Sequence, residues 1–132
     1  MNHLEGVRLH DPDLDSLSEV YQRPGSGYWV AEANGKIVGG GGLAPLPGEP
    51  GVCELQKLYF VRDVKGMGLG RRMIAFVLAE AKQQGYRACY LETLDELKDA
   101  VGLYKAFGFT HLTGAMGNTG HNSCGIWMIK TL

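Results

Sequence analysis

The chain has 132 residues, 45% of them hydrophobic and 20% charged, which is enough for one domain with a single core and too few for two ordinary domains. The formal net charge of -1 argues against nucleic acid as the main partner, because proteins that bind its backbone usually carry a basic excess. Three cysteines without a C-x-x-C pair, and the lack of any apolar run of the roughly 18 residues that span a bilayer, predict a cytoplasmic protein that does not enter the membrane.

The predicted elements alternate between strands and helices along most of the chain. In chain order they are a helix over residues 12–23, strands over 28–33, 36–43 and 52–61, a helix over 69–84, a strand over 86–94, a helix over 95–107, and strands over 109–112 and 125–129. Asp11-Pro12 is a typical helix start, Asn34-Gly35 favours a tight hairpin turn, and Gly85 is a typical residue just after a helix. This order implies a single α/β domain over residues 1–132 with one mixed sheet.

A glycine-rich turn joins the strand over 52–61 to the helix that follows it. It contains three alternating glycines and three basic residues, Gly66, Gly68, Gly70, Lys65, Arg71 and Arg72. Backbone N–H groups at a helix start have no intrahelical partner and lie at the positive end of the helix dipole. A turn without side chains at this point is suited to bind a phosphate group.

Several interpretations of this turn compete. A P-loop would require a lysine followed by Ser or Thr, which is not present. A dinucleotide-binding turn would require G-x-G-x-x-G, whereas the spacing here is G-x-G-x-G, although Glu92 follows at a suitable distance. A tight connection without any ligand would need only one or two of the three glycines. These two alternatives stay open beside a phosphate-binding role.

The turn also resembles the phosphate-binding motif Q/R-x-x-G-x-G/A of the GNAT superfamily of acyl-CoA-dependent N-acetyltransferases, with Lys65, Gly68 and Gly70 at its three marked positions. Residues 54–60 look like the fourth strand of that family, and residues 103–109 look like its L-Y-x-x-x-G-F segment. Together the three motifs extend the resemblance over residues 28–132. It implies a mixed, mostly antiparallel sheet with helices on both faces.

The chain departs from the family pattern at three points. Lysine replaces Arg or Gln at position 65, and Leu97 stands where the family usually has an asparagine that contacts the cofactor. The family also begins with a strand and two helices, whereas only about 27 residues precede the hairpin here. We therefore expect a shortened N-terminal part, in which residues 7–9 are a vestigial first strand or the first strand and helix are absent.

The resemblance implies that acetyl-CoA is the cosubstrate and that no metal is used. Its pantetheine arm would bind backbone groups of the strand over 52–61, and its pyrophosphate would bind the turn and the start of the next helix. The implied cofactor-binding residues are Leu58, Tyr59, Phe60, Lys65, Gly66, Met67, Gly68, Leu69, Gly70 and Arg71. His121 and Cys124 have the spacing i, i+3, but no further ligand pair supports a metal site.

Two residues are candidates for the proton transfers. Glu54 is the only carboxylate on its predicted strand, and regular alternation places it on one face with Leu58 and Phe60, so we consider it a candidate general base that acts through water. The alternative is a glutamate at the rim, in solvent or paired with Lys57. Tyr104 is the candidate general acid, because the family pattern places this hydroxyl near the thioester sulfur, although its helical spacing also fits a core residue.

The implied reaction is transfer of acetyl from acetyl-CoA to a primary amine of a small molecule or peptide by direct attack. The alternative is a CoA- or nucleotide-binding module without turnover, because a shortened N-terminus could remove part of the acceptor site. Tyr28, Trp29, Glu92, Thr93 and Trp127 are candidates to shape that site, with core packing as the competing role. A sheet without its first strand would expose an edge that a second copy could cover as a homodimer.

Overall fold

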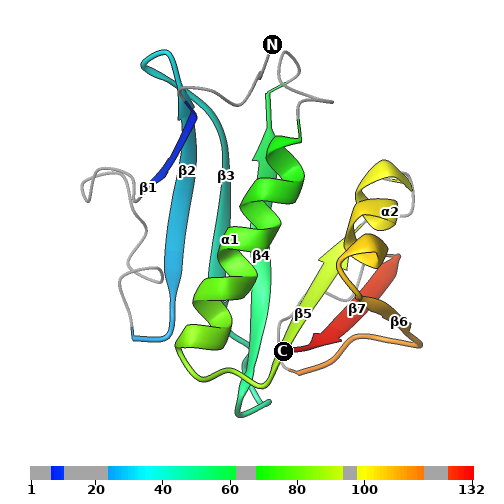
Figure 1. Ribbon diagram of the computed structural model, residues 1–132. Coiled ribbons are helices and arrows are strands. Elements are labelled where there is room, and N and C mark those ends of the chain that lie inside the picture. The colour runs from blue at the N-terminus through cyan, green and yellow to red at the C-terminus, as the bar shows by residue number, and fades with distance from the viewer. Residues whose placement is uncertain (1–6, 11–23, 62–67, 94–97, 118–124) are drawn as a thin grey trace.

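The structure is a computed structural model that describes residues 7–10, 24–61, 68–93, 98–117 and 125–132 (Figure 1). Its strands in chain order are β1 (Val7–His10), β2 (Gly27–Ala33), β3 (Lys36–Pro45), β4 (Val52–Phe60), β5 (Ala88–Thr93), β6 (Thr110–Leu112) and β7 (Ile126–Thr131). Its helices are α1 (Leu69–Gln83), between β4 and β5, and α2 (Lys98–Ala106), between β5 and β6.

The strands form one seven-stranded sheet in the order β1-β2-β3-β4-β5-β7-β6. Neighbouring strands are antiparallel except for β4 and β5, which are parallel and are joined through α1. The predicted mixed, mostly antiparallel sheet is therefore confirmed. A first strand is present in reduced form, because β1 has four residues and pairs with β2 along its whole length. The helix predicted to begin at Asp11-Pro12 lies outside the described residues.

The hairpin between β2 and β3 forms at the predicted turn. Asn34 and Gly35 have φ angles of 53° and 77°, the combination that a two-residue hairpin turn requires and that Asn and Gly adopt at low cost. The register starts from this turn with Ala33 opposite Lys36, and an irregularity between Ala31 and Glu32 then shifts it by one residue, so that Tyr28 lies opposite Gly42. The turn sets the pairs next to it, and the shift at Ala31 and Glu32 sets the pairs along the rest of the two strands.

Helix α1 has a clear start and a clear end. It begins after Gly68, whose φ is 80°. It ends before Gly85, whose φ is 94° and whose N–H donates to the carbonyl of Lys82, as in many glycine-terminated helices. Six apolar residues of the helix are buried on one side, namely Leu69, Met73, Ile74, Val77, Leu78 and Ala81. Their spacing of three and four residues is what attaches the helix to the sheet.

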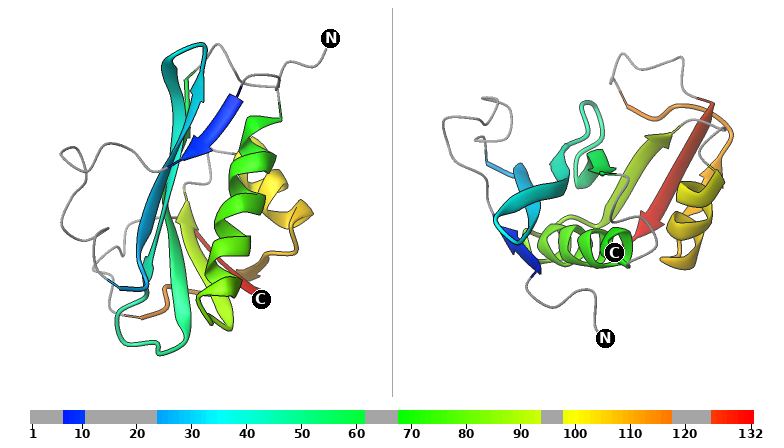
Figure 2. Two further views of the ribbon diagram at one scale, coloured as in Figure 1. Left: turned by 60° about the vertical axis from the view of Figure 1, so that its left-hand side comes forward. Right: turned by 90° about the horizontal axis from the view of Figure 1, so that it is seen from above.

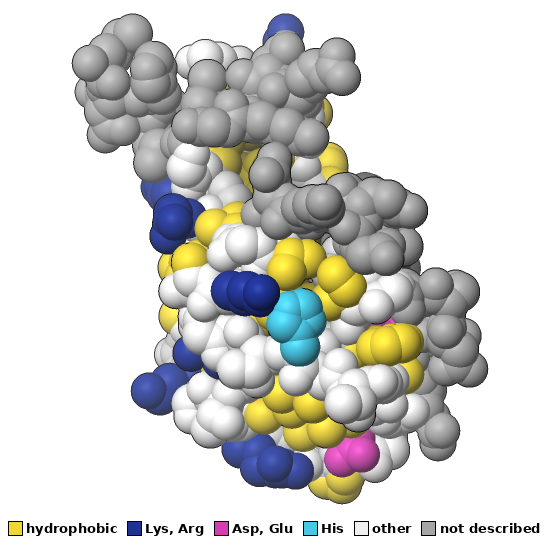
Figure 3. Space-filling model, turned by 90° about the vertical axis from the view of Figure 1, so that its right-hand side faces the viewer, with side chains coloured by type: hydrophobic (Ala, Val, Ile, Leu, Met, Phe, Trp, Pro, Cys, Tyr) yellow, Lys and Arg dark blue, Asp and Glu magenta, His cyan; other side chains and the backbone are white. Residues whose placement is uncertain are grey.

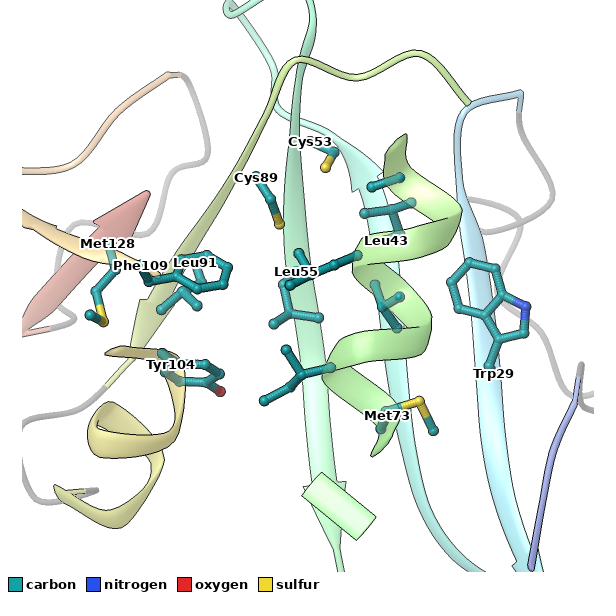
Figure 4. Close-up of a cluster of buried hydrophobic side chains, with 14 of the residues drawn as sticks. Trp29, Leu43, Cys53, Leu55, Met73, Cys89, Leu91, Tyr104, Phe109 and Met128 are labelled. Atoms are coloured by element: carbon teal, nitrogen blue, oxygen red, sulfur yellow. The ribbon is translucent and has the colours of Figure 1, made fainter. Parts of the chain in front are cut away.

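The two faces of the sheet have different partners. One face packs under α1 and α2 and contains the larger core cluster, which includes Leu55, Met73, Tyr104 and Phe109 (Figure 4). The opposite face holds a smaller cluster of four buried residues, Leu46, Val52, Ala88 and Tyr90. Both described helices lie on the same side of the sheet (Figure 2), so the described residues test the expected helical layer on this face only.

Candidate active site

Strands β4 and β5 separate halfway along their length. Their pairing covers only Val52 to Glu54 of β4, opposite Ala88 to Tyr90 of β5, although β4 continues to Phe60 and β5 to Thr93. Figure 1 shows the two strands diverging beyond this point. Peptide groups of β4 on the β5 side beyond Glu54 are therefore not used by a β4–β5 ladder. This separation fits the binding of the pantetheine arm to backbone groups of this strand, which the family resemblance implies.

A β-bulge in β4 lies close to the point where β4 and β5 separate. Gly42 pairs with Gln56 and Gly40 pairs with Tyr59, so that Gly41 stands opposite two residues, Lys57 and Leu58. Lys57 has a φ of 52°, a left-handed conformation that costs a residue with a side chain about 1 kcal/mol or more. An extra residue in one strand bends the strand and reverses its inside-outside alternation beyond the bulge.

The bulge overturns the expectation that Glu54 shares a face with Leu58 and Phe60. Both apolar residues pack against the cluster under α1. Glu54 instead pairs with Tyr90, which belongs to the smaller cluster on the opposite face. Regular alternation fails here because Lys57 is the inserted residue. The carboxylate therefore lies on the face away from both described helices.

The surroundings of Glu54 exclude the interpretation as a solvent-exposed rim residue. Its exposed fraction is 5%. Its Oε1 accepts a hydrogen bond of 2.6 Å from Nε2 of Gln56, two residues along the same face. The carboxylate thus lies buried beside the last β4–β5 pair. Sequence reasoning did not single out Gln56, although its spacing of two residues from Glu54 is the signal that could have identified it.

Tyr104 lies on the other face, where α2 carries it into the larger cluster (Figure 4). The residue is 7% exposed, and its ring meets that of Phe109 edge to face with centroids 5.9 Å apart. Burial, and to a smaller extent the nearby Cys89, raises the pKa of the Tyr104 hydroxyl to about 12. The phenol therefore stays protonated at any physiological pH and is able to donate a hydrogen bond.

The start of α1 has the features of an anion-binding helix terminus. Its N-cap, Gly68, makes no side-chain capping hydrogen bond, and the first turn contains no acidic residue. The first intrahelical bond recorded at this end runs from the N–H of Arg72 to the carbonyl of Gly68. The side chains of Arg71 and Arg72 are exposed at this turn. Lys65, Gly66 and Met67 of the predicted phosphate-binding turn lie outside the described residues.

The lack of a side chain at Gly70 also affects the packing of the two helices. A Cβ atom at this position would lie 3.0 Å from Cδ2 of Leu103 in α2. The absence of a side chain therefore lets α1 and α2 approach each other, in addition to any role in binding phosphate. Leu69, the residue before it, is buried and anchors the helix start in the core.

The glycine run in β3 makes room for aromatic rings on both faces. A Cβ at Gly39 would lie 2.3 Å from the ring of Phe60. A Cβ at Gly40 would lie 2.5 Å from the hydroxyl oxygen of Tyr28 and 2.9 Å from Cε1 of Tyr59. Gly41 stands opposite the bulge, while Gly40 provides space on the face of Glu54.

The residues suggested as shaping the acceptor site divide between the two faces. Trp29 packs under α1, where its ring meets that of Phe76 at 5.5 Å, so it is a core residue. Tyr90 and Trp127 belong to the opposite face. The Tyr90 hydroxyl donates a 2.6 Å hydrogen bond to Glu92 and accepts one of 3.1 Å from the N–H of Met116. This network connects β5 to the segment that precedes β7.

Other features of the described residues limit the chemistry. No group of three or more His, Cys, Asp or Glu side chains among them is arranged to hold a metal ion, and His121 and Cys124 lie outside the described residues. Cys53 and Cys89 are buried free thiols, and a hydrogen bond with Cys53, together with burial, raises the pKa of Cys89 well above its usual range. Such thiols are poor nucleophiles.

No described helix is long and apolar enough to cross a membrane. The side of the molecule that carries α2 and β6 shows basic side chains spread singly rather than gathered in one continuous patch (Figure 3).

Comparison with known proteins identifies relatives over most of the chain. The model of the acetyltransferase (GNAT) family matches residues 3–109. The uncharacterized N-acetyltransferase YjgM of Escherichia coli is 45% identical over 129 residues, which are 97% of this chain and 77% of that protein. N-acetyltransferase 8 of Rattus norvegicus is 36% identical over 104 residues, which are 76% of this chain but only 47% of that protein.

Solved structures share the fold. A GNAT-family acetyltransferase from Staphylococcus aureus has a TM-score of 0.78 at 24% identity, over 91% of this chain and 76% of that one. A GNAT-family acetyltransferase from Elizabethkingia anophelis, solved with acetyl-CoA bound, has a TM-score of 0.74 at 15% identity, over 97% of this chain and 99% of that one. At these identities the likeness establishes the fold alone.

Proposed function

The chain belongs to the acetyltransferase (GNAT) family, and from that premise we propose that it transfers an acetyl group from acetyl-CoA to a primary amine by direct attack of the amine on the thioester. One observation carries the proposal: a buried carboxylate, Glu54, lies at the last residue pair before β4 and β5 separate. A buried proton acceptor beside free backbone groups is the combination that this reaction requires.

The start of α1 supports binding of the donor. The backbone N–H groups of the first turn precede the first intrahelical hydrogen bond, from Arg72 to Gly68, and they are available to phosphate oxygens. Among the described residues, the N-cap is a left-handed glycine and the first turn has no acidic side chain, so neither a Cβ at position 68 nor a carboxylate of that turn opposes an anion here. The described residues therefore fit the pyrophosphate group of acetyl-CoA.

Glu54 is the proposed general base. A primary amine arrives mostly as its ammonium form at neutral pH and must lose a proton before it attacks. The Glu54 carboxylate accepts that proton, directly or through one water molecule, and the hydrogen bond from Gln56 holds the carboxylate in place. A positioned base of this kind contributes a factor of roughly 100 to 10,000 to the rate.

Backbone N–H groups of β4 stabilise the developing negative charge. Beyond Glu54 this strand has no ladder with β5, and the bulge at Lys57 turns its peptide groups. We assign the donor to the segment Leu58 to Phe60, where one N–H directed at the carbonyl oxygen of the thioester would act as an oxyanion hole. Loss of one such donor typically costs about 3 kcal/mol of transition-state stabilisation.

Tyr104 is suited to stabilise the departing thiolate rather than to transfer its proton completely. Its pKa of about 12 lies well above the value of roughly 8.5 for an ordinary thiol, so complete transfer from the phenol to the thiolate is uphill. A hydrogen bond from the Tyr104 hydroxyl to the sulfur leaves the proton on the phenol, so the difference in pKa does not oppose it. We therefore propose Tyr104 as a hydrogen-bond donor to the leaving group, while the thiolate takes its proton from the nitrogen, which must lose one as the tetrahedral intermediate collapses to the amide.

The test measures release of CoA thiol from acetyl-CoA over a panel of primary amines, together with thermal stabilisation of the protein by CoA. Thiol release that depends on the amine, with the acetylated amine identified by mass spectrometry, supports the proposal. Binding of CoA without release for any amine would identify a binding module instead. If CoA neither binds nor stabilises the protein, both interpretations are wrong.

A further inference from the structure

We infer that Tyr28 and Tyr59 form the wall of the acceptor site and select amines that carry an apolar substituent. This inference rests on the proposed function, because it concerns the second substrate of the same reaction. It begins from the face of the sheet on which Glu54 lies, opposite both described helices. On that face the two tyrosine rings meet over the bare backbone of Gly40.

The bulge brings Tyr59 to this face. With regular alternation Tyr59 would face α1, but the extra residue at Lys57 places Leu58 and Phe60 under the helix instead. Tyr59 pairs with Gly40, and its Cε1 atom would lie 2.9 Å from a Cβ at that position. The same backbone feature that frees peptide groups of β4 therefore also directs an aromatic ring to the face of the proposed base.

Tyr28 lies in the same row of the sheet as Gln56, which donates a hydrogen bond to Glu54. It pairs with Gly42, and Gly42 pairs with Gln56 on the far side of β3, so the three residues form one row across the sheet. From this row the Tyr28 ring extends to Gly40, where its hydroxyl oxygen occupies the space of the missing Cβ. Burial raises the pKa of Tyr28, and a hydrogen bond with Tyr59 adds to this shift. The two rings therefore hold each other in place.

The exposed part of this wall is apolar. Among the described residues three large hydrophobic side chains are exposed, and two of them are Tyr59 at 46% and Val61 at 40%. They are two residues apart beyond the bulge, so they share a face. At the other end of the same face are the buried carboxylate of Glu54 and the amide of Gln56.

This arrangement matches one kind of acceptor. The ammonium group complements the charge of Glu54, and an apolar substituent on the same molecule covers the ring of Tyr59 and loses its contact with water. Each methylene group buried in this way raises affinity by roughly fourfold. A dication of similar length would have to bring its second, strongly hydrated ammonium group to the aromatic wall, where a cation–π contact with an exposed ring offsets only part of the lost hydration. The site should therefore prefer a monoamine with an apolar body over a diamine.

The test compares steady-state thiol release for ethylamine, butylamine, hexylamine and putrescine. In the wild-type protein kcat/KM should rise by roughly fourfold for each buried methylene, and butylamine should exceed putrescine. Tyr59→Ala should remove most of this gradient, measured within the same variant as the ratio of kcat/KM for hexylamine to kcat/KM for ethylamine, so that any change in the rate common to all amines cancels. Gly40→Ala should have the same effect without deleting a ring, because its Cβ would displace both tyrosines.

Tyr86→Phe is the matched control, since the Tyr86 hydroxyl bonds the carbonyl of Gly25 away from this wall, and the gradient should persist in it. Thermal unfolding of each variant establishes that it is folded. A wild-type protein without a gradient, or a gradient that survives both Tyr59→Ala and Gly40→Ala, would overturn the aromatic wall while leaving acetyl transfer intact. Absence of thiol release with every amine would overturn the proposed function, and this inference with it.

Discussion

Glu54 and Leu58 lie on opposite faces of β4, although they are four residues apart in one strand. An even separation normally places two strand residues on the same face. Lys57, which has a left-handed φ of 52°, is the extra residue that places them on opposite faces. This relationship directs the proposed base to one side of the sheet and leaves the apolar residues of β4 to the core under α1.

The bulge can be tested through the backbone of Lys57. Lys57→Gly should be more stable than Lys57→Ala by about 1 kcal/mol, because glycine adopts a positive φ without the cost that a Cβ imposes. Both variants lose the lysine side chain, so the difference between them isolates the backbone. Chemical denaturation measures it, and both proteins should retain thiol release. Equal stabilities would mean that this conformation is not strained in solution.

The role of Glu54 can be tested with a neutral side chain of the same shape. Glu54→Gln should lower kcat by roughly 100-fold or more, as expected for loss of a general base, while the dissociation constant of CoA changes little. Glu32→Gln is the control, since Glu32 is a partly buried strand carboxylate that pairs with Arg8 and His10 at the other end of the sheet. Its kcat should stay within about twofold of wild type. An equal decrease in both variants would show a general loss of structure.

Tyr104→Phe should lower kcat by about 10- to 100-fold, the value of a hydrogen bond to a charged group. Binding of CoA should be nearly unchanged, because the ring remains in its contact with Phe109. Isothermal titration with CoA and initial-rate kinetics measure the two quantities separately. Unchanged turnover would return Tyr104 to a purely structural role.

Gly68→Glu should abolish CoA binding, because it adds bulk and negative charge at the N-terminus of α1 where the pyrophosphate would bind. Gly85→Glu is the matched control at the other end of the helix. Its φ is also positive, at 94°, and nothing lies within 4 Å of its added Cβ. Both variants have a strained backbone, but only Gly68→Glu should lose the thermal stabilisation by CoA. Retention of that stabilisation would exclude this turn as the binding site.

Stability should fall steeply in alkaline solution. The pKa of Tyr104 is raised from 10.0 to about 12 in the folded protein. Between these values the unfolded chain loses a proton that the folded protein keeps, so the contribution of this residue is complete below pH 10 and is lost as the pH rises through 12. In this range the residue lowers the free energy of unfolding by about 1.4 kcal/mol per pH unit. Denaturation of Tyr104→Phe between pH 10 and pH 12 should show a slope smaller by that amount, whereas an unchanged slope would contradict the raised pKa.

Local signals predicted most of the fold correctly. Asn34-Gly35 specified the hairpin because few residue pairs adopt positive φ at both positions. The apolar spacing of α1 and the stop at Gly85 specified that helix and its buried face. These predictions succeeded because each depends on residues within one turn or one helix.

The side of β4 that carries Glu54 was predicted wrongly for a different reason. Lysine is not a residue that marks a bulge, and position 57 lies in a run that otherwise has strand composition. The left-handed conformation arises from pairing with β3, where Gly40 and Gly42 each match β4 but leave Gly41 opposite two residues. Such a mismatch is a property of two strands together, and the composition of β4 alone does not reveal which of its residues is inserted.

By itself the sequence determined the element order, the hairpin, the buried face of α1 and the family to which the chain is similar, because these follow from local backbone preference and from short motifs. Only the tertiary structure decided that Glu54 is buried on the face opposite Tyr104 and that Tyr28 and Tyr59 meet over Gly40. These relationships depend on strand register, which results from packing between residues far apart in the chain.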